Sequence, residues 1–229
     1  MTSSKWHALG NVYLLVEQDD PLTAERAREL SRDTDGVLEV NGKQVKVWNP
    51  DGSVAEMSGN GARIAAAWFA RETGSQQVSF RIGVRDVNAT VVGDNVMLEV
   101  GRVDVGRPET VDGIEFTPVS VGNPHAVVRH DPADIRRLGP QIEKHARFPN
   151  RTNVQLVRVD GEHDLTVGVW ERGAGETTAS GTSAVAAAAA AIANGWCTSP
   201  VTVHMTGGDL YVEIADGEAR LTGPAVELA

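Results

Sequence analysis

Hydrophobic residues alternate with polar ones, or cluster with β-branched neighbours, in many short segments of the chain. Segments of about four to eight such residues, bounded by turn-forming residues, are typical of β-strands. We predict strands over 12–16, 45–48, 96–100, 154–159, 165–170 and 210–214, and a short C-terminal strand over 219–221. Asp-Gly pairs, which favour hairpin turns, follow several of these segments at 51–52, 112–113, 160–161 and 216–217. Strands joined by hairpins should therefore dominate the fold.

Helical periodicity occurs in fewer places. Residues 21–32 surround Ala24, Ala27 and Leu30 with charged side chains, which predicts an amphipathic surface helix. Segments 61–71 and 182–193 are almost wholly apolar and rich in alanine, so we expect two buried helices that other backbone approaches closely. A short helix is also predicted over 132–138, with Pro132 in its first turn.

Many strands with few helices indicate an α+β fold rather than a doubly wound parallel sheet. One pattern also occurs twice: a Gly-Asn pair at 10–11 and again at 122–123, and a Ser-Gly turn that opens an alanine-rich helix at 58 and again at 180. We therefore predict a duplication, with one domain over 1–112 and a second over 113–217. Chance recurrence of short Ala/Gly motifs is the alternative.

Composition narrows the class of protein. The chain has 229 residues, with 31 Asp and Glu against 21 Lys and Arg, and its net charge of −10 disfavours nucleic acid and anionic membrane as partners. The N-terminus lacks the apolar region of a signal peptide, and no segment has the length of a membrane span, so we expect a soluble cytoplasmic protein. One cysteine, Cys197, excludes an internal disulfide and a Cys-rich zinc site.

Two serines stand directly before the alanine-rich helices, in the motifs 58-SGNG-61 and 180-SGTS-183. A helix N-terminus carries unpaired N–H groups and partial positive charge, and therefore binds carboxylate or phosphate. If both helix starts held one carboxylate, Ser58 and Ser180 would lie on opposite sides of the attached carbon. That arrangement suits removal of a proton from one face and its return to the other. The alternative is that both serines are ordinary N-cap residues.

Further polar residues near these turns are binding candidates. Glu171 and Arg172, before a glycine loop, suit the ammonium and carboxylate of an amino acid, or form a surface ion pair. His125 follows Asn123-Pro124 in a loop and is either a site residue or a structural one. Beside turns or strand ends stand Asn11, Asn49, Asn60, Asn123 and Asn153, where asparagine is also a common turn former. The six histidines contain no pair at metal-binding spacing, so no metal is expected. The chain also lacks the Gly-x-Ser-x-Gly motif that would support a serine hydrolase.

Together these motifs resemble the diaminopimelate epimerase family. The resemblance covers most of the chain, through HALGN, WNPDGSVAEMSGNGARIAA, VGNPHAVV, FPNRTNV, WERGAGETTASGTSAVAAAA and GGDLYVEI. It implies two pseudo-symmetric domains, each a β-barrel-like sheet around a central alanine-rich helix, with the active site in the cleft. It further implies that the C-terminal strand, about 218–229, returns to the first domain, and that the protein is a homodimer.

Members of this family epimerise a free amino acid without pyridoxal phosphate or metal, using two cysteines as base and acid across the α-carbon. The resemblance aligns Ser58 and Ser180 with those cysteines. It assigns the backbone cradle of the α-carboxylate to Gly59, Asn60, Gly181 and Thr182, and the other substrate contacts to Asn11, Asn49, Asn123, Asn153, Glu171 and Arg172. His125 matches the histidine that flanks the cleft. The resemblance thus implies a cofactor-independent isomerase of lysine biosynthesis that converts LL- to meso-diaminopimelate by two-base proton transfer.

The serine pair leaves three functions open, because a serine hydroxyl is a much weaker acid than a thiol, whose pKa is about 8.5. The first is an epimerase whose serines are activated by a neighbouring base, for which His125, Glu56 and Glu171 are the candidates. The second is a related isomerase or dehydratase that uses a non-serine base, and the third is an inactive paralogue that binds an amino acid. An engineered Cys→Ser pair is a further explanation. Ile64 argues against engineering. Relatives often carry a third cysteine at this position, and an experiment that replaces the catalytic cysteines to trap a bound substrate would have no reason to change it.

Overall fold

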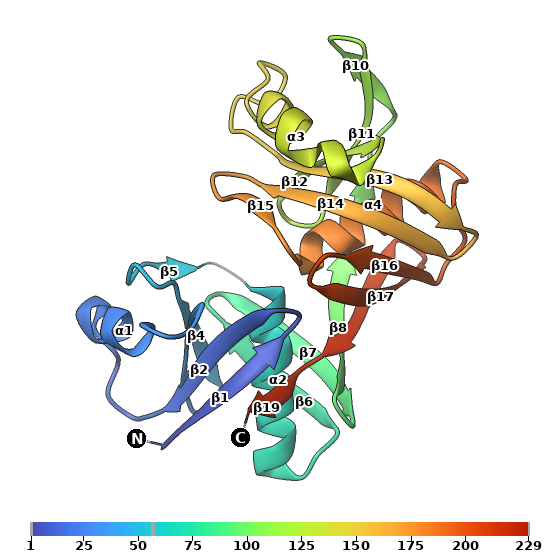
Figure 1. Cartoon of the computed structure of the whole chain (residues 1–229). Coiled ribbons are helices and arrows are strands. Elements are labelled where there is room, and N and C mark those ends of the chain that lie inside the picture. Colours follow the sequence, from blue (N-terminus) through green and yellow to red (C-terminus); the bar gives the residue numbers. More distant parts are fainter. Residues whose placement is uncertain (1, 56–57, 229) are drawn as a thin grey trace. The chain divides into compact units, whose positions relative to one another are not determined.

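The computed structural model describes residues 2–55 and 58–228, most of them in strands joined by short turns (Figure 1). Contacts divide the chain into two units, residues 1–99 with 222–229, and residues 100–221. This division falls earlier than the sequence-based boundary at 113. The reason is that β9 (Asp104–Val105) pairs with β11 (Ile114–Ser120) and therefore belongs to the second unit. The chain crosses the division in β8 (Asn95–Arg102) and β18 (Glu218–Pro224).

The described part of the first unit is a sheet with two helices. Its other elements are β1 (Thr2–Ala8), β2 (Asn11–Glu17), α1 (Ala24–Leu30), β3 (Gly36–Asn41), β4 (Gln44–Trp48), β5 (Val54–Ala55), α2 (Gly59–Thr73), β6 (Gln77–Ile82), β7 (Arg85–Val92) and β19 (Val226–Leu228). Antiparallel pairing joins β1 to β2, β3 to β4, β6 to β7, and β7 to β8. Two parallel pairs connect these groups, β2 with β3 across α1 and β4 with β6 across α2. Near the C-terminus, β19 pairs with β1.

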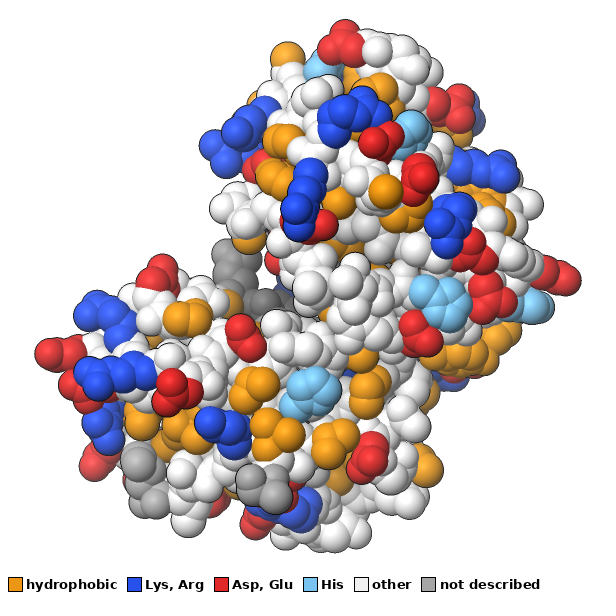
Figure 2. Space-filling model, viewed as in Figure 1, with side chains coloured by type: hydrophobic (Ala, Val, Ile, Leu, Met, Phe, Trp, Pro, Cys, Tyr) orange, Lys and Arg blue, Asp and Glu red, His pale blue; other side chains and the backbone are white. Residues whose placement is uncertain are grey.

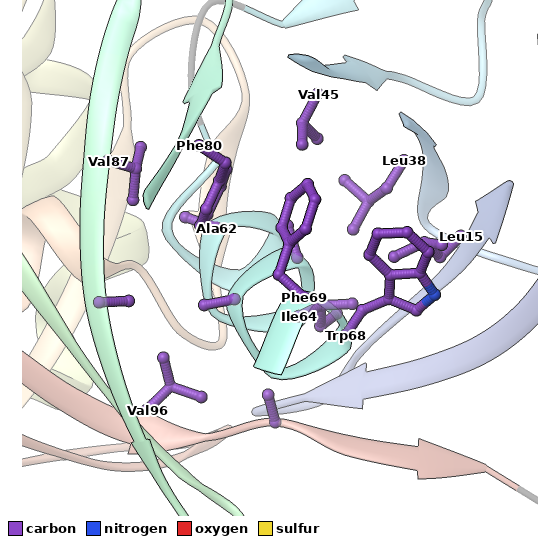
Figure 3. Close-up of a cluster of buried hydrophobic side chains, with 14 of the residues drawn as sticks. Leu15, Leu38, Val45, Ala62, Ile64, Trp68, Phe69, Phe80, Val87 and Val96 are labelled. Atoms are coloured by element: carbon purple, nitrogen blue, oxygen red, sulfur yellow. The ribbon is translucent and has the colours of Figure 1, made fainter. Parts of the chain in front are cut away.

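Helix α2 occupies the centre of the hydrophobic core of this unit (Figure 3). Its N-cap is Ser58, and it ends at Gly74, whose φ of 67° is left-handed and favours a residue without Cβ. Phe69 of α2 stacks on Phe80 of β6 with ring centroids 5.1 Å apart. Aliphatic side chains of the surrounding strands, such as Leu38, complete the cluster. Burial of this helix holds its N-terminus in a fixed place relative to β1 and β2.

The second unit is also a sheet with few helices. Its other elements are β10 (Glu109–Val111), β12 (Pro124–Arg129), η1 (Pro132–Asp134), α3 (Ile135–Glu143), β13 (Asn153–Gly161), β14 (Asp164–Glu171), β15 (Gly175–Thr177), α4 (Gly181–Ala193), β16 (Val201–Met205) and β17 (Gly208–Ala215). Antiparallel pairing joins β11 to β12, β13 to β14 and β16 to β17. The parallel pairs are β12 with β13, across η1 and α3, and β14 with β16, across α4.

Helix α4 is buried around its whole circumference. All residues from Ala184 to Ala191 are buried, and all of them except Val185 are alanine. Because methyl side chains take little space, strands β11 to β14, β16 and β17 all contact the helix. The alanine-rich segment therefore acts as a core helix, as predicted from its lack of a polar face.

The predicted elements agree with the structure in type and differ in some boundaries. A mixed helix-and-strand fold dominated by a sheet, with few helices, is confirmed. Helix α1 begins at Ala24 rather than at residue 21, because Thr23 is its N-cap and accepts a hydrogen bond from Arg26 N–H. The turn predicted at 160–161 is wrong. Strand β13 continues through Gly161 after a register shift, and the hairpin turns at residues 162–163. Acidic and basic side chains are interspersed over the visible surface (Figure 2).

Candidate active site

Ser58 lies at the N-terminus of α2 in the first unit. The serine has extended backbone angles, and its Oγ accepts a hydrogen bond from Gly61 N–H at 3.0 Å, so it is an N-cap. A second oxygen lies beside it, since Tyr13 Oη of β2 is 3.2 Å from Ser58 Oγ. Gly59 follows with a half-buried backbone. Ser58 is thus an N-cap residue, and it is only partly buried.

A chain of polar contacts runs from the first turn of α2 to the start of β2. Asn60 is buried and donates from its side-chain amide to Asn11 Oδ1. Arg63, fully buried, donates to Asn60 Oδ1 at 2.6 Å, and makes longer contacts to Gly59 O at 3.4 Å and Pro224 O at 3.3 Å. Among the described residues no carboxylate pairs with this guanidinium. Burial lowers the pKa of Arg63 to about 10, so the side chain is still charged at neutral pH. A buried positive charge therefore reinforces the helix dipole at this point.

Two candidates of the first unit do not join this group. Asn49 follows β4, and its amide donates to Ser53 Oγ at 2.9 Å within its own turn. Glu56, a candidate auxiliary base, lies outside the described residues. The first unit therefore brings together Asn11, Ser58, Gly59 and Asn60.

Ser180 holds the equivalent place before α4 in the second unit, with different contacts. Its backbone is extended, as expected for an N-cap, but its hydroxyl makes no capping hydrogen bond. Among residues 2–55 and 58–228, no hydrogen-bond partner of this hydroxyl is present. Gly181 is buried and Thr182 is half-buried in the first turn that follows. The Ser180 hydroxyl is therefore unrestrained by the helix it precedes.

His125 is almost fully buried on β12, next to β13. Its Nε2 lies 2.9 Å from Asn123 Oδ1, while its Nδ1 has no hydrogen-bond partner in the described part of the chain. Gln155 of β13 donates to Ser183 Oγ in the first turn of α4 at 3.0 Å. Burial lowers the pKa of His125 to about 4; the Gln155 amide opposes this shift and the Arg172 charge adds to it. His125 is therefore a neutral imidazole at physiological pH.

Asn153 joins two loops of the second unit. It donates to Pro124 O at 3.0 Å and accepts from Arg172 N–H at 2.9 Å. Glu171, half-buried at the end of β14, has no ionic partner among the described residues, and Arg172 reaches only Asn150 O, at 3.5 Å. The two side chains thus do not form the surface ion pair that was the alternative explanation. Both charges are available to a charged ligand.

The loop after Glu171 has an anchor that the sequence did not reveal. Glu143, at the end of α3, accepts from Trp170 Nε1–H and from Gly173 N–H, each at 2.9 Å. Burial raises the pKa of Glu143, but these hydrogen bonds and the Arg151 charge outweigh burial, so the net shift is downward. Sequence reasoning therefore missed three residues that contact the candidate residues or the loop beside them: Tyr13, Arg63 and Glu143. Helical spacing puts Arg63 beside Gly59 and Asn60, whereas nothing in the sequence marked the other two.

Comparison with solved structures identifies the fold. A predicted epimerase from Pseudomonas aeruginosa has a TM-score of 0.73 at 16% identity, covering 99% of this chain and 96% of its own. A phenazine biosynthesis protein of the PhzF family from Enterococcus faecalis has a TM-score of 0.75 at 11% identity, with the same coverage. A hydroxyproline epimerase from Agrobacterium vitis, with bound trans-4-hydroxy-L-proline, has a TM-score of 0.63 at 15% identity over 99% of this chain and 90% of its own. The chain thus has the fold of these epimerases and of the PhzF protein.

Proteins related in sequence identify the family as well as the fold. A family model described as diaminopimelate epimerase matches residues 117–228. The diaminopimelate epimerase of Desulfitobacterium hafniense is 36% identical over 267 positions, which cover 96% of this chain and 94% of the relative. That of Pelotomaculum thermopropionicum is 34% identical, covering 100% of this chain and 97% of the relative. The chain belongs to the diaminopimelate epimerase family.

The described residues contain neither a metal-binding cluster nor a membrane-spanning helix. No group of three or more His, Cys, Asp or Glu side chains in residues 2–55 and 58–228 is arranged to hold a metal ion. Within the same ranges, no helix has the length and apolar character needed to cross a membrane.

Proposed function

We propose that this chain is a diaminopimelate epimerase, an isomerase that inverts one α-carbon of its substrate without a cofactor. The observation that carries the proposal is the 34–36% identity that extends over nearly the whole chain to proteins of that name. Those relatives favour an epimerase over a dehydratase or an inactive binding protein. A cytoplasmic location and a homodimer remain part of this proposal, and the homodimer rests on the family resemblance alone.

Two similar units, derived by duplication, are the second part of the proposal. Each unit contains the same order of elements twice: an antiparallel strand pair, a helical connection, and a strand that pairs in parallel with the strand before the connection. In both units the second connection is a buried helix, α2 in the first unit and α4 in the second. Gly10 and Gly122, which precede the asparagines of the repeated motif, both have φ of 83°. Ser58 and Ser180 have φ and ψ of −138° and 120°, and −145° and 122°. These agreements support a pseudo-symmetric pair of catalytic serines.

The chemistry follows from the two helix starts. Backbone N–H groups of Gly59, Asn60, Gly181 and Thr182 hold the α-carboxylate, where the helix dipoles stabilise the negative charge that develops on deprotonation. Ser58 and Ser180 then exchange protons with opposite faces of the α-carbon. Arg63 adds a positive charge behind Asn60, at 2.6 Å from its side-chain oxygen. This concentration of positive charge lowers the cost of forming the carbanion.

The remaining site residues hold the substrate. Glu171 and Arg172, which have no ionic partners in the described chain, pair with the ammonium and carboxylate of the distal amino-acid group. Asn153 fixes the position of Arg172 through the 2.9 Å hydrogen bond to its backbone. Asn11, Asn49 and Asn123 supply further amide contacts. His125, neutral and buried, and Glu56 remain candidates for an auxiliary base to the serines.

The experiment is α-hydrogen exchange in D₂O, followed by NMR with LL- and meso-diaminopimelate in separate reactions. We expect exchange with inversion. Ser58→Ala and Ser180→Ala should each lower inversion by at least about 100-fold, since general acid–base groups contribute roughly 10²–10⁴. Ser3→Ala and Ser120→Ala, at exposed positions in β1 and β11, are matched controls that should leave the rate unchanged. Loss of water from the substrate, or saturable binding without exchange, would contradict an epimerase.

A further inference from the structure

Among the described residues, the Tyr13 hydroxyl is the only side-chain group within hydrogen-bond distance of the Ser58 hydroxyl. The two oxygens are 3.2 Å apart. The tyrosine is 8% exposed on β2, and its ring lies against Gly36, where a Cβ would come within 2.9 Å of ring atom Cε1. Because the core and Gly36 hold the ring, the hydroxyl is directed at Ser58 by packing rather than by a flexible contact.

The position of Tyr13 in its strand places it at the proposed site. Residues two apart in a strand point to the same face, so Tyr13 shares a face with Asn11. Asn11 accepts from Asn60 and Tyr13 contacts Ser58, so this face of β2 meets the first turn of α2 at two points. Among the described residues, the charged groups with contacts at this junction are Arg63 of α2, through Asn60, and Asp35, which accepts from Val12 N–H at 2.8 Å.

The hydrogen-bonding capacity of Ser58 leaves room for the reaction. A serine hydroxyl donates one hydrogen bond and accepts two. Gly61 N–H takes one acceptor position at 3.0 Å, and Tyr13 can take the donated hydrogen. One lone pair of Ser58 Oγ is then left to receive a proton from the substrate.

We propose that Tyr13 is a positioning residue that exchanges a proton with Ser58 in each turnover, so that the two oxygens together replace one cysteine thiolate. This inference rests on the proposed epimerase function. As the α-carbon–hydrogen bond breaks, its proton joins Ser58 Oγ, and the proton already on Ser58 moves to the Tyr13 phenolate. The electron pair stays on the α-carbon beside the carboxylate. In the opposite direction Tyr13 returns its proton to Ser58, and Ser58 protonates the carbanion.

A phenol suits this role better than a serine alone. Its ordinary pKa is about 10, far below that of an aliphatic hydroxyl, so it ionises in a range that serine does not reach. The N-terminus of α2 and the buried charge of Arg63 both favour a negative charge at this place. Ser180 has no equivalent partner among the described residues. The assistance therefore applies to one face of the substrate only.

The first test needs no substrate. The chain has two tyrosines, and Tyr211 is an exposed residue of β17, so Tyr211→Phe leaves Tyr13 as the only phenol. Ultraviolet titration of phenolate in this variant reports Tyr13 directly. If Ser58 donates to the phenolate, adding Ser58→Ala raises the titration midpoint. A midpoint that does not move on loss of the serine hydroxyl would overturn the pairing.

The second test uses exchange in D₂O. Tyr13→Phe keeps the packed ring and removes only the hydroxyl, and Tyr211→Phe is its matched control. We expect Tyr13→Phe to lower exchange from one stereoisomer by about 100-fold or more, while the other exchanges without inversion, as in Ser58→Ala. A purely structural defect would instead lower exchange from both isomers alike, and that result refutes the proposal.

A rescue variant separates the chemistry from folding. A thiol at position 58 ionises without help, so Ser58→Cys should make Tyr13 dispensable. We expect Ser58→Cys with Tyr13→Phe to stay within about tenfold of Ser58→Cys alone, whereas an equal loss in both backgrounds would count against proton exchange. If the wild-type protein exchanged neither isomer while the Tyr13 midpoint still responded to Ser58→Ala, the epimerase function would fail and the coupled pair would stand.

Discussion

Replacing Glu143 by alanine should destabilise the second unit and loosen the loop that carries Arg172. The carboxylate is 3% exposed, and it accepts from Trp170 Nε1–H and Gly173 N–H at 2.9 Å each. Arg151 Nη1 lies farther away, at 3.5 Å. The two short bonds fix the end of β14 and the residue after Arg172, so their loss affects both stability and substrate binding.

The magnitude follows from the two hydrogen bonds that the alanine variant loses, one from the partly buried Trp170 and one from the exposed Gly173. Because water can reach both donors, each hydrogen bond contributes about 0.5–1.5 kcal/mol, and the expected loss is roughly 1–3 kcal/mol. For a chain of this size a loss of 1 kcal/mol lowers Tm by about 2–4 °C, which predicts a fall of roughly 2–12 °C. The contribution depends on pH, because the pKa of Glu143 is lowered in the folded state. It is present above the ordinary pKa of a glutamic acid and is lost as pH falls through the folded value.

Thermal unfolding of wild type and Glu143→Ala at pH 7 and in mild acid measures both effects. Glu115→Ala, at an exposed position on β11, is a matched control that should leave Tm unchanged. The difference in Tm between wild type and Glu143→Ala should shrink in acid, and KM for diaminopimelate should rise more than kcat falls. A loss below 1 kcal/mol at pH 7, or one that does not change with pH, would refute the reasoning.

Three further predictions concern the packing of α4, the buried charge of Arg63 and the buried imidazole of His125. Ala187→Leu should lower stability by about 1–3 kcal/mol in denaturant unfolding, because α4 is enclosed by strands and has no space for three more carbons; normal stability would show that the helix is loosely packed. Arg63→Lys keeps a charge behind Asn60 and should retain a higher kcat/KM than Arg63→Met, and equal values would exclude an electrostatic role. His125, whose pKa burial lowers to about 4, should make the protein less stable as pH falls from 6.5 towards 4, since the unfolded chain binds that proton first. His125→Asn should flatten this decline in Tm, and an unchanged slope would assign the decline to other groups.

The sequence was sufficient for the elements whose pattern is local. Alternation in 210–214 and the apolar runs at 61–71 and 182–193 predicted strands and buried helices correctly, because side-chain periodicity reports directly which faces are covered. The positions of turns were predicted less accurately than the strands and helices. The Asp-Gly pair at 160–161 was a reasonable hairpin signal, but the register of β13 against β14 moved the turn to residues 162–163. Register depends on the partner strand, which no local pattern contains.

Within the proposed site, the motifs indicated which residues stand at helix starts, and the structure determined their surroundings. Ser58 and Ser180 have the same motif and nearly the same backbone angles, yet only Ser58 caps its helix and has a tyrosine oxygen beside it. That difference depends on Tyr13, which is 45 residues away in sequence. Glu143 is likewise 30 residues from Gly173, whose N–H it binds. Such contacts form only when separate segments come together, so spacing along the chain does not reveal them.

By itself, the sequence determined the mixed strand-and-helix class, the two alanine-rich core helices, the family resemblance and the absence of cysteine at both proposed catalytic positions. These properties are readable because residue type and periodicity are local. The tertiary structure alone decided that the buried Arg63 has no carboxylate partner in the described chain, that His125 is held neutral, and that one serine has a phenol at hydrogen-bond distance. Burial, charge pairing and proton affinity depend on distances between segments remote in sequence, and only folding sets those distances.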